Sequence, residues 1–154
     1  MKKIFLSAIL SLSVLASSAY AEIKMGIILG FTGPIESLTP AMAASAELAF
    51  KEASDSGSLL GGEKITPVRA DSTCVDSAAA TTAAEGLVSQ GIAAIMGADC
   101  SGVTGAIASN VAVSNGIVMI SPSATSPGLT TLDDKGLFFR TAPSDARGGQ
   151  ILAD

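Results

Sequence analysis

The chain has 154 residues, of which nine are basic and fourteen acidic, and it contains no histidine. Histidine is the most common general base and the most common metal ligand, so we expect neither a metal site nor a histidine-activated nucleophile. No run of lysine or arginine occurs after residue 21, so we expect no nucleic-acid partner.

The first 21 residues have the pattern of a secretory signal peptide. Lys2 and Lys3 precede the apolar run Ile4–Ala16, and residues 19–21 (Ala-Tyr-Ala) carry the small residues that signal peptidase cleaves after. A membrane anchor is the alternative, but spanning needs ~20 apolar residues and no positive flank follows this run. We therefore predict cleavage after Ala21, export to the periplasm, and a mature chain that is free of the membrane.

The mature chain is predicted to begin with a strand over Ile23–Gly30, whose nearly continuous apolar run is typical of a strand buried on both faces. A helix follows, with Thr39 as its predicted N-cap and Gly57 as its end. On the exposed face of this helix we expect an ion pair between Glu47 and Lys51, which are four residues apart.

The second predicted strand, Ile65–Asp71, contains Pro67. Proline cannot donate a hydrogen bond to a neighbouring strand, so we place this strand at an edge of the sheet. The helix after it is predicted to begin with Asp76 as its cap and to end at Gly91.

Further apolar runs predict three more strands: Ile92–Gly97, Ile117–Ile120 and Leu137–Thr141. Between the first two of these, Ser101 is predicted to cap a helix that Gly116 ends, and Ser144 is predicted to cap a last helix.

Strands that alternate with helices predict a doubly wound, Rossmann-like α/β domain with a parallel sheet of about five strands and helices on both faces. With the Pro67 strand at the edge, the expected strand order is 2-1-3-4-5. This order puts a topological switch point between strands one and three, where ligands bind outside the carboxyl ends of the strands. Residues 22–154 are predicted to form this one domain.

Three polar loops follow strands at this carboxyl edge: residues 31–34, 98–102 and 121–125. The second loop leads into a helix, whose first N–H groups can bind an anion, and the hydroxyls of Ser101 and Thr125 can add uncharged donors. The loops together favour a site for a small anionic group. Taken singly, Ser101 has a simpler interpretation as a helix cap and Thr125 as a turn residue.

Cys74 and Cys100 are the only cysteines. In an oxidising compartment an even pair predicts a disulfide, and two buried free thiols are the alternative. A metal site is not expected, because two cysteines without histidine cannot complete a tetrahedral shell.

Several short motifs occur in a characteristic order: residues 32–34 (Thr-Gly-Pro), the two cysteines after strands two and three, residues 120–125 (Ile-Ser-Pro-Ser-Ala-Thr) and residues 139–141 (Phe-Arg-Thr). In this order the chain resembles the periplasmic leucine/isoleucine/valine-binding proteins of ABC importers, the type I solute-binding family. The resemblance implies two α/β lobes joined by a hinge that close over an amino acid. It also implies that residues 22–154 are an incomplete first lobe and that the second lobe is absent from this sequence.

The same resemblance implies a set of ligand-binding residues. Ser101 would hold the ligand α-carboxylate, and Thr125 would bind the amino-acid head group through its hydroxyl and backbone amide. The Ser123 carbonyl would accept from the ammonium, with Ala124 between them. Leu38 falls where relatives often carry a pocket aromatic residue, so the side-chain pocket would be wider here. Cys74 and Cys100 match the disulfide of the family's first lobe.

These observations predict the substrate-binding component of an ABC importer for branched-chain or related amino acids. We expect a monomer without cofactor or enzymatic activity that binds the importer's membrane subunits. The first alternative is the ligand-sensing extracellular domain of a receptor with the same fold, and the second is an exported hydrolase that uses one of the serines. Amides, urea, γ-aminobutyrate and aromatic acids remain open as ligands.

Overall fold

Five parallel strands and the helices between them make up the part of the chain that the computed structural model describes, residues 22–59 and 61–154. The strands are β1 (Glu22–Leu29), β2 (Lys64–Asp71), β3 (Ala94–Gly97), β4 (Val118–Ser121) and β5 (Phe138–Arg140). They form one sheet in the order β2-β1-β3-β4-β5, which confirms the predicted fold class and strand order. The predicted signal peptide lies outside the described residues.

The position of β2 follows from its proline. Pro67 lies opposite Met25 of β1, and β2 has no second neighbouring strand among the described residues. An edge strand tolerates a residue without an N–H group, as predicted. From β1 the chain connects to β2 on one side, whereas from β3 it connects to β4 on the other side. The direction in which successive strands are added to the sheet therefore reverses between β1 and β3. This is the predicted switch point.

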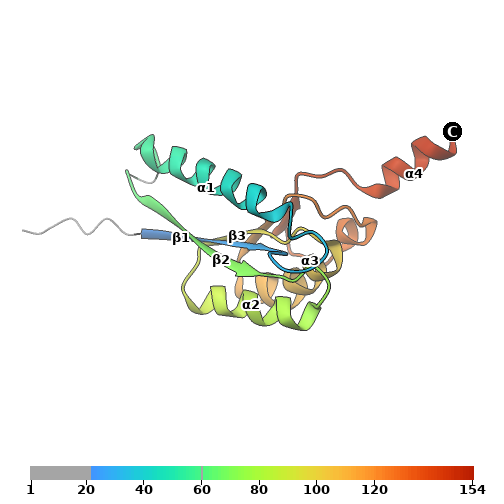
Figure 1. Cartoon of the computed structure of the whole chain (residues 1–154), viewed down its shortest axis with the longest axis horizontal. Coiled ribbons are helices and arrows are strands. Elements are labelled where there is room, and N and C mark those ends of the chain that lie inside the picture. The colour runs from blue at the N-terminus through green and yellow to red at the C-terminus, as the bar shows by residue number, and fades with distance from the viewer. Residues whose placement is uncertain (1–21, 60) are drawn as a thin grey trace, which may run out of the picture.

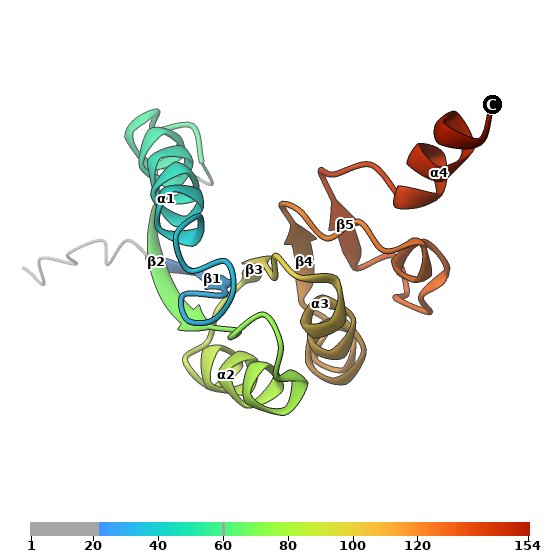
Figure 2. The ribbon, with the colours of Figure 1, turned by 45° about the vertical axis from the view of Figure 1, so that its right-hand side comes forward.

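Helices cover the two faces of the sheet unequally. Helix α1 (Thr39–Asp55) lies on one face. Helices α2 (Ser77–Ser89) and α3 (Ser101–Ile107) lie on the other, and α3 continues as a π-helical turn, η1 (Ala108–Ala112), and a 3₁₀ turn, η2 (Val113–Asn115) (Figure 1). After β4 the chain forms a 3₁₀ turn, η3 (Pro127–Thr131), and after β5 it forms α4 (Asp145–Ala153), which projects away from the sheet (Figure 2). Among the described residues no helix is both long and apolar enough to cross a membrane.

The main core lies between the sheet and helices α2 and α3. Four strands contribute one fully or almost fully buried side chain each: Ile28, Ile95, Met119 and Phe138. The predicted helical faces supply the other side of this core, with Ala80, Ala84 and Leu87 from α2 and Val103 and Ile107 from α3. This burial of apolar area is the main force that holds the sheet against these helices.

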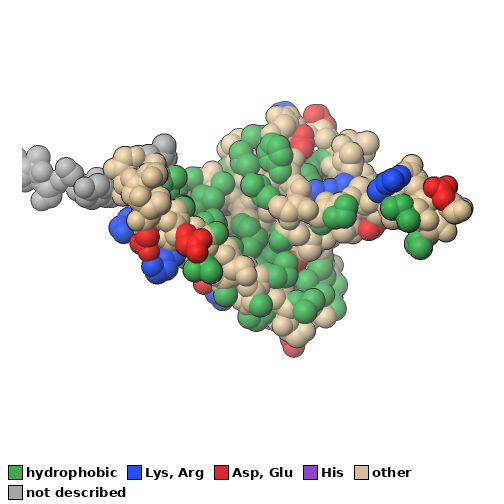
Figure 3. Space-filling model, turned by 90° about the horizontal axis from the view of Figure 1, so that it is seen from above, with side chains coloured by type: hydrophobic (Ala, Val, Ile, Leu, Met, Phe, Trp, Pro, Cys, Tyr) green, Lys and Arg blue, Asp and Glu red, His purple; other side chains and the backbone are tan. Residues whose placement is uncertain are grey.

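On the opposite face, one row of side chains becomes more exposed with distance from α1. The row runs in register from Ile27 through Met96 and Ile120 to Phe139, one residue each from β1, β3, β4 and β5. Ile27 is fully buried and Met96 partly buried, whereas Ile120 is 42% and Phe139 52% exposed. Figure 3 shows apolar side chains gathered at the surface on the α1 side. Within the described residues, then, only the part of this face near β1 and β2 is covered.

The start of α1 differs from the prediction. Leu38 occupies the N-cap position without a side-chain bond to the helix, and Thr39 is the first helical residue. The Thr39 hydroxyl is buried and donates to the Gly30 carbonyl, at 3.1 Å. Thr39 therefore joins α1 to the end of β1 instead of capping its own helix.

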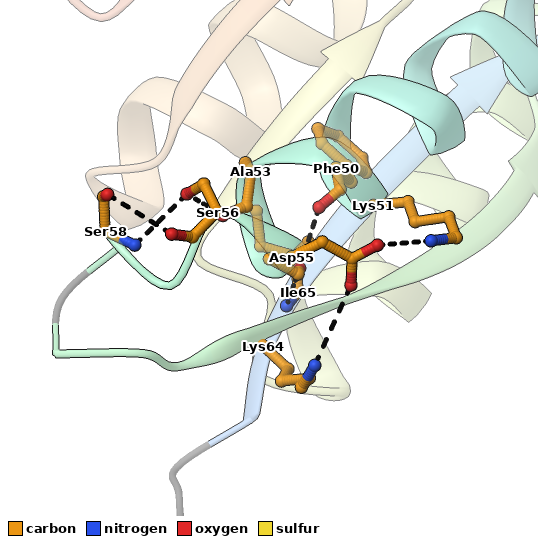
Figure 4. A network of polar contacts seen from close by, with 9 residues as sticks. Phe50, Lys51, Ala53, Asp55, Ser56, Ser58, Lys64 and Ile65 are labelled. Atoms are coloured by element: carbon orange, nitrogen blue, oxygen red, sulfur yellow. Dashed lines mark hydrogen bonds and ion pairs between the residues drawn. The ribbon is translucent and has the colours of Figure 1, made fainter.

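The prediction of an ion pair between Glu47 and Lys51 along α1 is also wrong, because each residue pairs with a different partner. Glu47 accepts two hydrogen bonds from the guanidinium of Arg69 on β2, at 2.6 and 2.8 Å. Lys51 instead pairs with Asp55, which also lies 3.9 Å from Lys64 (Figure 4). A fork-shaped guanidinium can hold both oxygens of a carboxylate, which a lysine cannot.

Two of the predicted helix caps are confirmed. The Asp76 carboxylate accepts from the backbone N–H groups of Ala78 and Ala79 at 2.9 and 3.0 Å, and Ser144 accepts from Ala146 at 3.3 Å. Gly116 ends the α3–η1–η2 segment in a left-handed conformation, with a φ of 67°.

Candidate functional site

The loops at the carboxyl ends of β1, β3 and β4 lie side by side, because these strands are neighbours in a parallel sheet. The three loops are the ones that the sequence predicted as a ligand site. The described residues form no pocket here, so this edge of the sheet is an open surface. Within residues 22–59 and 61–154, no group of three or more acidic or cysteine side chains is placed to hold a metal ion.

A buried aspartate links the first two loops and the end of β2. Asp99 is 3% exposed, and its carboxylate accepts from the N–H of Gly30 at 2.7 Å and from its neighbour Cys100 at 2.9 Å. The Ser72 hydroxyl contributes a longer bond, at 3.4 Å. Hydrogen bonds to a charged group are stronger than neutral ones, so Asp99 fixes the relative position of these loops.

Two serines link the third loop to the second. The Ser121 hydroxyl is buried, donates to the Ala98 carbonyl and accepts from the N–H of Ala124 at 3.0 Å. The Ser123 hydroxyl donates to the Asp99 carbonyl at 3.0 Å. The loop after β4 is thereby held against the loop after β3.

Ser101 and Thr125, the two predicted donors, meet directly. The Ser101 hydroxyl oxygen accepts from the backbone N–H groups of Thr125 and Ser126, both at 3.1 Å. It does not cap α3, in which Cys100 holds the N-cap position, so the prediction of Ser101 as a cap is wrong. An oxygen that accepts two hydrogen bonds polarises its own O–H group, which makes Ser101 a stronger donor to a third partner.

Arg140 on β5 holds the same loop from the other side. One of its guanidinium nitrogens donates to the carbonyls of Ala124 and Ser126, at 3.3 and 2.8 Å, and another donates to the Thr130 hydroxyl at 2.6 Å. Ser101 thus fixes the N–H groups of Thr125 and Ser126, and Arg140 fixes the carbonyls of the residues on either side of Thr125.

The predicted site residues divide into two groups. Ser101, Ser123, Ala124 and Thr125 are brought together by the hydrogen bonds just described, with Ala124 fully buried and Ser123 exposed. Leu38 is 60% exposed at the start of α1, and its backbone bonds join it only to Ile35 and Met42. Leu38 lies at the same edge of the sheet, but no hydrogen bond of the described residues joins its segment to the other four.

Three charged residues of this region had no predicted role: Asp99, Arg140 and Asp145. Asp99 follows an apolar run directly, and a charge in that position is a recognisable sign of a buried polar link. Arg140 and Asp145 have no comparable sign, because their partners on the third loop are 14 to 20 residues away in the sequence.

The predicted disulfide is confirmed. Cys74 and Cys100 are bonded, with an S–S distance of 2.01 Å and Cα atoms 5.2 Å apart. The bond joins the loop after β2 to the residue before Ser101, so it crosses the end of β1. The alternative of two free thiols is therefore wrong.

Asp71 holds the loop after β1 against the end of β2. Its carboxylate accepts from the Thr32 hydroxyl at 2.6 Å and from the N–H groups of Thr73 and Thr32 at 2.8 and 3.3 Å. Partial burial alone would raise the pKa of Asp71, but these bonds outweigh it and hold the pKa below its ordinary value. The ionised form is therefore favoured by folding.

We expect Asp71→Asn to lower the free energy of unfolding by about 1 kcal/mol at neutral pH, since hydrogen bonds to a partly exposed carboxylate contribute modestly. A depressed pKa stabilises the fold above the ordinary aspartate pKa of ~3.9, and this contribution is lost as the pH falls through the folded-state value. Urea unfolding should thus show a larger difference between variant and parent at pH 7 than at pH 3. The exposed Asp133→Asn is the control, and an equal difference at both pH values would contradict the prediction.

Comparison with known proteins gives a consistent set of relatives. The family model described as periplasmic binding protein matches residues 22–154. Leu/Ile/Val-binding protein homolog 3 of Brucella melitensis is 33% identical over 141 residues, which cover 90% of this chain and 37% of that protein. The leucine-specific-binding protein of Salmonella typhimurium is 31% identical over 151 residues, which cover 98% of this chain and 40% of that protein. The chain thus spans well under half the length of these relatives.

Solved structures show the same likeness. The branched-chain amino acid transporter substrate-binding protein LivJ of Streptococcus pneumoniae, in complex with isoleucine, matches with a TM-score of 0.72 and 31% identity, over 82% of this chain and 35% of that one. An ABC transporter substrate-binding protein of Desulfitobacterium hafniense, in complex with Leu, matches with a TM-score of 0.70 and 32% identity, over 86% of this chain and 38% of that one.

Proposed function

Because the chain belongs to the periplasmic binding protein family, we propose that it is the first lobe of the substrate-binding component of an ABC importer for branched-chain amino acids. In this proposal the protein acts in the periplasm after cleavage of residues 1–21 and delivers its ligand, as a monomer, to the importer's membrane subunits. The relatives are solute-binding proteins and not enzymes, and they do not favour the alternative of a receptor domain.

One observation of this chain supports the proposal most directly. The Ser101 hydroxyl lies at the carboxyl edge of the sheet and accepts from two consecutive N–H groups of the neighbouring loop. No acceptor for its proton lies among the described residues, so the proton can go to a ligand, and a carboxylate is a strong acceptor that a small solute can offer. Thr125 and the Ser123 carbonyl lie on the same loop, where they would meet the head group of an amino acid.

The open edge of the sheet fits a site that is completed by a second surface. With no pocket in the described residues, a ligand on Ser101 and Thr125 would remain exposed to water on one side. Ligands of this size are normally enclosed over most of their surface. We therefore propose that a second lobe closes over the ligand, with exposed Leu38 at the rim of the resulting cleft.

Calorimetric titration with leucine, isoleucine and valine tests the proposal on the parent protein with the proposed second lobe included. We expect binding by the parent protein and an affinity about ten- to a hundredfold lower for Ser101→Ala, because a hydrogen bond to a charged ligand is lost. Ser109→Ala makes the same change at an exposed serine of η1 and should leave the affinity unchanged. Failure of the parent to bind any amino acid would rule the proposal out.

A further inference from the structure

The peptide group between Ala124 and Thr125 is hydrogen-bonded at both of its ends. Its N–H, which belongs to Thr125, donates to the Ser101 hydroxyl oxygen at 3.1 Å. Its carbonyl, which belongs to Ala124, accepts from the Arg140 guanidinium at 3.3 Å. A continuous chain of hydrogen bonds therefore leads from the guanidinium, through one peptide group, to the Ser101 hydroxyl.

All the donors in this chain of hydrogen bonds point in the same direction. The guanidinium donates to the carbonyl, the N–H of the same peptide group donates to Ser101, and the Ser101 proton can go to a ligand. Hydrogen bonds in such a series strengthen one another, because each polarises the next group, and a charged first donor polarises more than a neutral one. Arg140 should therefore make Ser101 a stronger donor without touching the ligand.

The positive charge of Arg140 is not neutralised within the described part of the chain. Its guanidinium donates only to the carbonyls of Ala124 and Ser126 and to the Thr130 hydroxyl, all of them neutral groups. The ion pairs of residues 22–59 and 61–154 do not include it. The side chain is partly buried, so water screens its charge less than that of an exposed side chain. An anion that binds to Ser101 would be attracted by this charge.

The second peptide group that donates to Ser101 has no charged donor on its carbonyl. The Ser126 N–H shares a peptide group with the Thr125 carbonyl, which accepts from the backbone N–H of Asp145 at 3.0 Å. The Asp145 carboxylate accepts from the Thr125 hydroxyl at 2.8 Å, but Asp145 is exposed, so water screens its negative charge more than the charge of Arg140. Of the two chains that end at Ser101, only the one from Arg140 begins at a cation.

We propose that Arg140 is a positioning residue for the ligand carboxylate, which acts through the peptide group of residues 124–125 and the Ser101 hydroxyl. The inference rests on the proposed function, and it adds a residue outside the ligand contacts on which the affinity depends. In this arrangement the guanidinium has two effects. It holds the backbone of the loop after β4, and it supplies positive charge to a site whose direct donors are uncharged.

A double-mutant cycle tests whether Arg140 acts through Ser101. Calorimetry measures leucine binding by the parent protein with the proposed second lobe included, by Ser101→Ala, by Arg140→Met and by the double variant. Methionine keeps an apolar stem in place of arginine and removes the charge. We expect Arg140→Met alone to weaken binding about tenfold. In the Ser101→Ala background the same change should weaken binding by less than about threefold, because the hydroxyl through which Arg140 acts is already gone.

Two further variants separate charge from mere support of the loop. Arg140→Lys keeps the charge on a flexible stem, and its leucine affinity should stay within about threefold of the parent. Arg147→Met removes the charge of an exposed arginine on α4 and should leave the affinity unchanged. Any loss of stability caused by Arg140→Met is present in both backgrounds and cancels in the cycle.

The outcomes that contradict the inference differ from those that contradict the proposed function. Equal losses for Arg140→Met in both backgrounds, or a lysine variant as weak as the methionine variant, would show that Arg140 only supports the loop. No loss for Arg140→Met would likewise overturn its role. Each of these results leaves the proposed function intact, whereas a parent that binds no amino acid would overturn the proposed function and the inference with it.

Discussion

Replacing Gly97 by alanine is expected to lower the free energy of unfolding by about 3–5 kcal/mol, combining the cost of overpacking with that of a strained backbone. A Cβ atom at this position would lie 2.0 Å from the Ile28 carbonyl oxygen, and the φ of 131° is one that residues with a side chain rarely adopt. Gly97 ends β3 and pairs with Ile28 of β1, so the clash falls in the centre of the sheet. The backbone of two strands would have to separate to accommodate a single methyl group.

Urea unfolding followed by circular dichroism measures this loss. Gly102→Ala is the matched control, because nothing lies within 4 Å of a Cβ there and its φ is not in the positive range. Alanine is favoured over glycine inside a helix, so this control should be neutral or slightly stabilising. A Gly97→Ala protein as stable as the parent would contradict the close approach of β1 and β3 described here.

The disulfide is expected to have the second large effect. Replacing both Cys74 and Cys100 by serine should lower the free energy of unfolding by roughly 3.5 kcal/mol, since the bond closes a loop with a sequence separation of 26 residues. The chain-entropy account attributes this loss to the greater freedom of the unfolded chain. Because Cys100 immediately precedes Ser101, we also expect weaker ligand binding in the double variant.

Reduction provides the internal control for this prediction. A reducing agent should lower the thermal midpoint of the parent to about that of the double serine variant and leave the variant itself unchanged. A parent whose midpoint does not respond to reduction would show that the bond contributes little to stability. Such a result would contradict the prediction without affecting the assignment of the strands.

Much of the fold could be predicted because its signals are local. The apolar runs gave the strands to within about two residues, and Pro67 alone identified the edge strand, from which the strand order follows. Asp76 and Ser144 were correctly predicted as caps because their partners are only two or three residues away.

Predictions failed where a side chain has a distant partner that competes with the local one. The Thr39 hydroxyl bonds Gly30 instead of its own helix, and that of Ser101 bonds a loop 24 residues later. Glu47 pairs with Arg69 instead of Lys51, because Arg69 lies on a neighbouring strand and offers two donors. Local hydrogen-bond rules describe such residues correctly only when folding brings no better partner within reach.

The candidate site likewise has a part that the sequence could predict and a part that it could not. Ser101, Ser123 and Thr125 could be predicted as neighbours because the strands that precede their loops are adjacent in the sheet. Asp99 has a local sign of burial, but its partner Gly30 could not be predicted, and neither could the role of Arg140, because each bond depends on the backbone path of a loop that the sequence does not specify.

The row of side chains from Ile27 to Phe139 has a consequence for how the domain opens. Near β1 the sheet is packed between two layers of helices, whereas β4 and β5 are packed on one face only, within the described residues. Regions with fewer buried apolar contacts open at a lower cost than the rest of a domain. Local unfolding should therefore start at β5 and progress toward β1, so the amide protons of Phe138 and Phe139 should exchange with solvent before those of Ile27 and Ile28. The loop that carries Thr125 is anchored by Arg140 of this same strand, so the proposed site lies on the part of the sheet that is the first to fluctuate.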